Sequence, residues 1–229
     1  MQLRPRSSIS WRSAAEAFLN RPWIGIAGIT FRDACNADPR FDLRLKAGDH
    51  PATCHSSPVI MNPFSTSDLH DACMDRPEVH LQVARPGLKS FGGKHCYSGE
   101  ITTAAAAGTS ALRLRDILSE TGLGRVLVVE GNGIDAQWAL LGDRMGQLAL
   151  DNGWSGVVLH GYIRDVAALK NIALGVHALG SLPSRPRWPE SIPVMRDIPL
   201  TLHGMRFLPG HWLYADEDGL ITTDRPISL

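Results

Sequence analysis

Residues 125–165 read RVLVVEGNGIDAQWALLGDRMGQLALDNGWSGVVLHGYIRD, and their changing pattern is the strongest structural signal in the chain. The runs 125–130 and 156–160 have continuously apolar centres, residues 126–129 and 157–159, as expected of strands covered on both faces of a sheet. Between them, residues 139–152 carry apolar side chains at helical spacing, which predicts a helix. A strand, helix and strand in this order predict an α/β fold.

Further elements are predicted on both sides of this segment. The segment from Ser65 to Asp68 predicts the start of a helix, because a hydroxyl or carboxylate accepts hydrogen bonds from the first free backbone amides. A second helix is predicted over 112–118 and ends before Gly122. The remaining predictions are strands at 175–179, 198–202 and 212–214, and an irregular connection over 183–193.

The first 60 residues differ from the rest. They have no sustained helical or strand period and are interrupted by prolines, so we predict an N-terminal extension, 1–60, and one folded domain, 61–229. Arginines among serines near the start suit a targeting segment. The alternative, which we favour, is an upstream region included by too early a start choice, because Met61 lies just ahead of the first domain-like segment.

Composition argues against several functional classes. Lysine and arginine total 23 and aspartate and glutamate total 23, so the net charge is zero and no basic surface for nucleic acid is expected. No apolar run reaches the roughly 18 to 20 residues of a membrane-spanning helix. The four cysteines form no CxxC pair, which argues against a zinc site or a disulfide framework. We therefore expect a soluble, cytoplasmic protein.

Two short motifs carry the residues suited to chemistry. Gly142-Asp-Arg-Met145 is followed, after a predicted strand, by Gly161-Tyr-Ile-Arg-Asp165, and twenty residues separate Asp143 from Arg164. Arg164 and Asp165 would lie beyond the carboxyl end of the strand, where open α/β sheets bind ligands. A guanidinium suits a substrate carboxylate, and a carboxylate suits a hard divalent cation. The alternative is a helix-capping aspartate beside an exposed arginine.

With these motifs the chain resembles the family of 4-hydroxy-4-methyl-2-oxoglutarate aldolases, which also contains the regulator of ribonuclease activity A. The resemblance covers roughly residues 64–221. It is specific because several separate segments carry it together: Ser90-Phe-Gly-Gly93, Gly124–Val129, Ala139–Asp143, Asn152–Val158, Gly161–Asp165, Arg196–Pro199 and Trp212–Gly219.

The resemblance implies a swivelling β/β/α-type domain that forms homotrimers with active sites at subunit interfaces. It implies that Asp165 ligates Mg²⁺ or Mn²⁺ and that Arg164 binds oxygens of a small 2-oxo acid. The backbone of Gly142, Asp143, Arg144 and Met145 would cradle the substrate carboxylate, and Asp143 would order a metal-bound water. Asp143 and Arg164 are the expected catalytic residues. The implied reaction cleaves 4-hydroxy-2-oxo acids to pyruvate and decarboxylates oxaloacetate through the same enolate.

Three departures from the family pattern put the substrate in doubt. The family's Asp-Gly-Gly-Gly-Ser followed by arginine is replaced by the sequence from Glu130 to Trp138, which is one residue longer. Residues 104–110 replace a more acidic stretch, and 183–193 lack the usual glycine-rich loop. These changes leave Arg164 and Asp165 in place.

Other functional readings compete with a lyase. Gly131 to Ala136 satisfies the GxGxxA form of a dinucleotide-binding turn, but no acidic residue ends the next predicted strand. A non-catalytic regulator that binds RNA-degradation enzymes is the second alternative, although some of those relatives lack the aspartate present here as Asp165. Asp216-Glu-Asp218 is interpreted either as a solvated turn or as a segment reaching a neighbouring subunit's site.

Overall fold

The computed structural model describes residues 64–106, 113–186 and 194–227. The predicted extension, 1–60, and its boundary at Met61 lie outside these ranges and stay predictions. Most of the connection predicted over 183–193 and most of the departure at 104–110 also lie outside them. Across the described ranges, no helix has the length and apolar character needed to cross a membrane.

One ten-stranded mixed sheet forms the centre of the domain, with a separate two-stranded hairpin, β9–β10. Strands β3, β4, β6 and β7 run parallel side by side, and antiparallel strands flank them. The main path runs in the order β1-β12-β11-β3-β4-β6-β7-β2, while β5 joins β6 and β8 joins β3. The strands are β1 Gln82–Val83, β2 Lys89–Ser90, β3 Tyr97–Ala106, β4 Val126–Glu130, β5 Ala139–Leu141, β6 Gly156–Ile163, β7 Gly175–Ser181, β8 Val194–Arg196, β9 Leu200–Leu202, β10 Met205–Phe207, β11 Trp212–Ala215 and β12 Leu220–Thr223.

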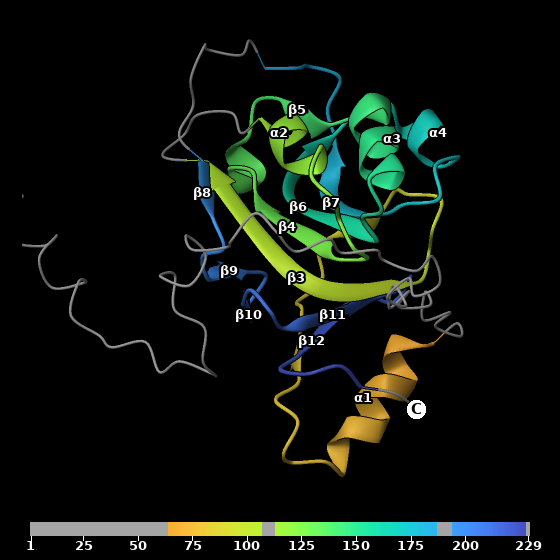
Figure 1. Ribbon diagram of the computed structural model, residues 1–229, viewed down its shortest axis with the longest axis vertical. Coiled ribbons are helices and arrows are strands. Elements are labelled where there is room, and N and C mark those ends of the chain that lie inside the picture. Colours follow the sequence, from red (N-terminus) through yellow and green to blue (C-terminus); the bar gives the residue numbers. More distant parts are fainter. Residues whose placement is uncertain (1–63, 107–112, 187–193, 228–229) are drawn as a thin grey trace, which may run out of the picture. The chain divides into compact units, whose positions relative to one another are not determined.

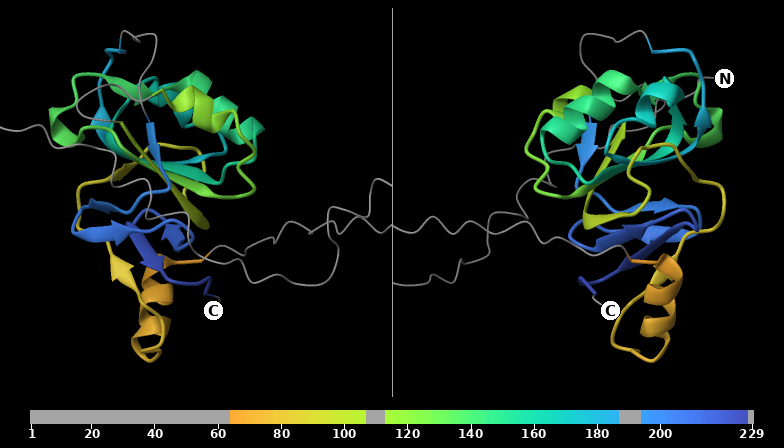
Figure 2. Two further views of the ribbon diagram at one scale, coloured as in Figure 1. Left: turned by 60° about the vertical axis from the view of Figure 1, so that its left-hand side comes forward. Right: turned by 90° about the vertical axis from the view of Figure 1, so that its right-hand side faces the viewer.

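The strand β3 joins two β layers. Residues 97–100 pair with β11 antiparallel, whereas residues 101–105 pair with β4 in parallel. Helices α2 (Leu114–Leu118), α3 (Asp143–Asp151) and α4 (Val166–Leu169) cover one face of the parallel strands, and the C-terminal strands cover the other (Figures 1 and 2). One apolar core lies on each face. This arrangement confirms the predicted β/β/α type of fold.

Most predicted elements are present, with one clear correction. Helix α1 (Thr66–Met74) begins after Ser65, whose hydroxyl accepts a hydrogen bond from the Asp68 amide. The prediction of one helix over 139–152 is wrong in its first part, because Ala139–Leu141 forms β5 and α3 begins only at Asp143. All three residues of β5 are buried, and their pairing with β6 outweighs their helical spacing.

A buried tyrosine fixes how the parallel strands pack on the second β layer. Tyr97 is 1% exposed, and its ring lies against Gly156 and Gly175, where any side chain would overlap it. Its hydroxyl lies 2.8 Å from Nδ1 of His177, which is itself buried. Burial also raises the pKa of Tyr97 above its usual range. This pair gives the interior one polar contact that is closed to solvent.

Candidate functional site

The pairing of β5 with β6 brings the two chemical motifs together. The strands run parallel, and Leu141 pairs with Ile163, so the next residues, Gly142 and Arg164, emerge at the same edge. The Arg164 amide donates a hydrogen bond of 2.9 Å to the Leu141 carbonyl, which continues the pairing to the edge itself. Parallel strands with adjacent carboxyl ends are the usual ligand-binding edge of an α/β sheet.

Gly142 permits the close approach of the second motif. A Cβ atom at this position would lie 2.6 Å from Oδ2 of Asp165 and 3.0 Å from Cγ of Arg164. Asp165 has a φ of 57°, a left-handed conformation that aspartate and asparagine tolerate better than most residues. Its Oδ2 accepts a 3.0 Å hydrogen bond from Nε of Arg164, and both side chains are about one third exposed. The pair is therefore accessible to a ligand.

The start of α3 forms the adjoining wall. Gly142 is the N-cap and offers no side-chain cap, while its carbonyl accepts hydrogen bonds from the amides of Met145 and Gly146. The backbone amides of a first helical turn have no partner within the helix and favour an anion. One carboxylate oxygen of Asp143 accepts a 2.6 Å hydrogen bond from the Arg144 amide.

These residues line one cavity of about 900 Å³. All six predicted positions, Gly142 to Met145 with Arg164 and Asp165, contribute to its wall. The structure adds charged residues that sequence reasoning missed, because they come from distant segments and no motif links them. These are Arg113, Arg115, Asp116 and Arg185.

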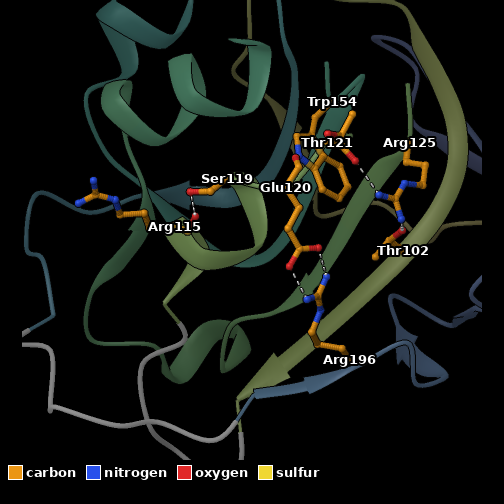
Figure 3. A network of polar contacts seen from close by, with 8 residues as sticks. All are labelled: Thr102, Arg115, Ser119, Glu120, Thr121, Arg125, Trp154 and Arg196. Carbon is orange, nitrogen blue, oxygen red and sulfur yellow. Dashed lines mark hydrogen bonds and ion pairs between the residues drawn. The ribbon is translucent and has the colours of Figure 1, made fainter. Parts of the chain in front are cut away.

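A polar network anchors α2, which carries part of that wall (Figure 3). Glu120, just after the helix, accepts two hydrogen bonds from Arg196 of β8, at 2.7 and 2.8 Å. This bidentate contact with Arg196 lowers the pKa of the Glu120 carboxyl. The Glu120 carbonyl also accepts from Nε1 of Trp154, whose ring packs under Arg125. The far end of α2 is thus tied to the core and to β8.

The donor atoms of the cavity suit a hard divalent cation. Asp143 and Asp165 offer carboxylate oxygens near the Gly142 edge, and no histidine or cysteine lines the cavity. Within the described residues, no group of three or more histidine, cysteine, aspartate or glutamate side chains can hold a metal by itself. Mg²⁺ commonly binds through one or two carboxylates and keeps several waters. The residues present therefore fit Mg²⁺ or Mn²⁺ with water or substrate oxygens completing the shell.

The Gly131 to Ala136 segment does not form a dinucleotide-binding turn. A short 3₁₀ helix, Gly133–Asp135, follows β4, and the next element is the strand β5. The sequence expectation of a long helix after these glycines is wrong, so no helix N-terminus is available there for a pyrophosphate. Glu130 instead contacts Nδ1 of His160 at 2.9 Å.

The acidic turn Asp216 to Asp218, between β11 and β12, holds the start of α1. Asp216 accepts hydrogen bonds from the amide and the hydroxyl of Thr66, at 2.6 and 2.7 Å. Asp218 accepts from the Ser67 hydroxyl. Two of these carboxylates therefore have structural partners within the chain, and the neighbouring-subunit role stays a prediction.

The described fold resembles solved structures with substantial sequence identity. An RNA-processing inhibitor, RraA from Thermus thermophilis, is 35% identical, with a TM-score of 0.63 over 73% of this chain and 96% of that one. A crystal structure from Geobacillus kaustophilus, titled as an S-adenosylmethionine:2-dimethylmenaquinone methyltransferase, is 36% identical, with a TM-score of 0.64 over 72% and 97% of the two chains.

The chain also has relatives that are similar in sequence. A protein of Laribacter hongkongensis, provisionally named a 4-hydroxy-4-methyl-2-oxoglutarate aldolase, is 44% identical over 72% of this chain and 98% of its own length. A protein of Xanthomonas campestris with the same provisional name is 43% identical over 69% and 92%. The model of the RraA-like family, described as Aldolase/RraA, matches residues 66–222. The chain therefore belongs to the RraA-like, Aldolase/RraA family.

Proposed function

We propose that this chain is a divalent-metal-dependent lyase that cleaves 4-hydroxy-2-oxo acids, such as 4-hydroxy-4-methyl-2-oxoglutarate, to pyruvate. The same site would decarboxylate oxaloacetate. We also propose that it acts in the cytoplasm as a homotrimer, as the family resemblance implies. The carrying observation is the convergence of Gly142, Arg164 and Asp165 at one edge of the sheet, inside an accessible charged cavity.

Three features of the chain would bind the 2-oxo acid end of the substrate. Arg164 would offer a planar guanidinium to the carboxylate or 2-oxo oxygen, and the positive end of α3, beginning at Asp143, would favour the carboxylate. Asp165 would hold Mg²⁺ or Mn²⁺, with Asp143 ordering a water beside it. When bound, such a cation supplies Lewis-acid stabilisation of negative charge developing on the substrate oxygens.

The cleavage needs a proton acceptor and a positive charge at fixed positions. As the C3–C4 bond breaks, its electron pair passes to C3 and the 2-oxo group, and the 4-hydroxyl proton leaves so that C4 becomes a carbonyl. Asp143, or a water that it holds, would accept this proton, because its Oδ2 has no hydrogen bond to another described residue. Arg164 stabilises the enolate oxygen, and C3 then takes up a proton to give pyruvate. Decarboxylation forms the same enolate without a base.

The test is pyruvate release from oxaloacetate and from 4-hydroxy-4-methyl-2-oxoglutarate. Purified protein is assayed with Mg²⁺, with Mn²⁺ and after EDTA, and the spontaneous decay of oxaloacetate is subtracted. We expect release that requires the cation and returns when EDTA is titrated out. Release no faster than the uncatalysed rate with either cation would contradict the proposal.

A second candidate is a protein-binding inhibitor of RNA processing, which the 35% identity to the Thermus inhibitor favours. Its readout is independent of turnover. Capture of an RNA-degradation enzyme by the immobilised chain, together with absent lyase activity, would support it. Lyase activity without such capture would reject it.

A further inference from the structure

Strand β6 changes its register with β7 shortly before it reaches the candidate site. Residues 156–159 of β6 pair in step with β7, and the pairing resumes one residue out of step at Tyr162. The extra residue lies within 160–161, which we call the β6 bulge. A bulge bends its strand and changes the direction of the side chains that follow. The charged side chains that follow here are Arg164 and Asp165.

The end of β4 holds the histidine of the β6 bulge. Glu130 pairs with His160 in the parallel register, and the Gly131 amide donates a 2.9 Å hydrogen bond to the His160 carbonyl. Nδ1 of His160 also lies 2.9 Å from Oε2 of Glu130. An ionised carboxylate only accepts hydrogen bonds, so the ring donates through Nδ1. The two side chains are 26% and 32% exposed, and a partly buried contact of this kind is screened less than one on an open surface.

Two further elements enclose the β6 bulge. A Cβ atom at Gly133, in the short 3₁₀ helix, would lie 2.8 Å from Cε1 of His160, so the turn after β4 passes close over the ring. His203, in the turn between β9 and β10, packs edge to face on the same ring, with the ring centroids 5.2 Å apart. The Tyr162 hydroxyl donates to the Ile134 carbonyl at 3.1 Å. The bulge is thus held by the 3₁₀ helix and the hairpin as well as by β4.

The segment that holds the β6 bulge is one in which this chain departs from the family pattern. Residues 130–138 replace the family's glycine-rich sequence, and within them Glu130, Gly133 and Ile134 contact β6. None of these three residues lines the cavity that contains Arg164. Any effect of the segment on the candidate site must therefore pass through β6.

We propose that Glu130 and His160 are positioning residues for the lyase reaction, and that their contact fixes the direction in which Arg164 and Asp165 leave β6. The inference rests on the proposed function and adds a determinant of it outside the cavity. Arg164 stands four positions after His160, so a change in the bulge reaches the charged pair directly. A displacement of about 1 Å at catalytic groups can lower a rate about 10²-fold.

Two amide replacements of His160 separate its hydrogen bond from the rest of the ring. Asparagine places its amide nitrogen where Nδ1 lies, whereas glutamine places it where Nε2 lies, away from Glu130. We expect His160→Gln to lower kcat/KM about 10-fold, with a higher KM and a higher cation concentration for half-maximal activity, because Arg164 and Asp165 both move. His160→Asn should recover most of the loss. Equal losses in the two variants would overturn the inference.

A merely structural role would give a different kinetic result. Fewer folded molecules would lower kcat and leave KM and the cation requirement unchanged, and that outcome would overturn the inference. Glu130→Ala should reproduce His160→Gln, and the double variant should be no worse than either, because each change removes the same contact. Losses that add in the double variant would contradict this. His70→Gln, which removes a histidine–aspartate contact on α1, should keep the wild-type kinetics.

A spectroscopic measurement separates this inference from the proposed function. The Nε–H group of Arg164 donates to Asp165, and its ¹⁵N–¹H signal is identified by its absence from Arg164→Lys. We expect this signal to shift in His160→Gln and in Glu130→Ala and to keep its wild-type position in His160→Asn, even if no substrate yields pyruvate. An unshifted signal in His160→Gln would overturn the inference, and pyruvate release at the wild-type rate by that variant would leave the lyase standing.

Discussion

Two groups of polar side chains, one at the end of β6 and one within β7, differ in their exposure to solvent. At the end of β6, Arg164 and Asp165 are about one third exposed and open to a large cavity. Inside β7, His177 is buried, and its ring contacts only groups of the protein that satisfy it. The first arrangement keeps charge available for a ligand, whereas the second uses polarity to fix packing.

If this contrast is correct, loss of Asp165 should affect activity most. We expect Asp165→Asn to lower kcat about 10³-fold and to abolish Mg²⁺ binding, because a cation contributes several kcal/mol to transition-state stabilisation. Asparagine is preferred to alanine as the test, since it tolerates the φ of 57° at this position. Kinetics and calorimetric Mg²⁺ titration check the expectation.

The control for this variant is Asp151→Asn at the end of α3, outside the cavity wall. It should keep both turnover and cation binding. Circular dichroism should give matching spectra for the two variants and the wild type. A fully active Asp165→Asn protein would refute the metal assignment, and an Arg164→Ala protein should then be examined for the remaining charge stabilisation.

A substitution of Gly142 should cause a smaller loss of activity at the same edge of the sheet, where β5 and β6 end. Gly142→Ala should lower kcat/KM about 10²-fold, because the new Cβ would lie 2.6 Å from Oδ2 of Asp165 and displace it. The backbone of Gly142 has a φ of −143°, which alanine adopts freely, so the fold should survive. Steady-state kinetics measure the loss. Gly180→Ala is the matched control, since its Cβ would meet Tyr162 at an ordinary 3.6 Å.

The sequence predicted the parts of this architecture that depend on local patterns. The apolar runs predicted β4 and β6, because strands covered on both faces need no alternation of apolar and polar residues. The Ser65 hydroxyl predicted the start of α1 for an equally local reason. Arg164 and Asp165 were found because they directly follow a recognisable strand.

The parts that sequence reasoning missed depend on contacts between distant segments. The three residues of β5 are too few to show a period, and only their pairing with β6 makes them a strand. The alanine end of β3, residues 104–106, has little strand character of its own, yet Ala104 and Ala105 pair with both β4 and β8. Likewise, Arg113 and Arg185 meet in one cavity only after the sheet has formed.

The buried His177 should affect the stability of the fold rather than turnover. Burial lowers the pKa of His177 to about 4, with Tyr97 facing one ring nitrogen and the Asp216 backbone facing the ring as well. The unfolded chain takes up this proton near its ordinary pKa of about 6.5, so stability is present above that pH and falls as the pH drops toward 4. Between pH 7.5 and pH 5 we expect this histidine to cost about 2 kcal/mol of unfolding free energy.

Urea unfolding at several pH values measures the effect. His177→Gln should flatten the curve between pH 5 and pH 7.5, whatever its effect on stability at neutral pH, because an amide takes up no proton in this range. His70→Gln, at a partly exposed position on α1, should keep the wild-type slope. If the unfolding free energy of His177→Gln depended on pH as steeply as that of the wild type, the buried ring would not be the group that resists protonation. The buried Tyr97–His177 pair would then not have the purely structural role that we contrast with the open site at Arg164 and Asp165.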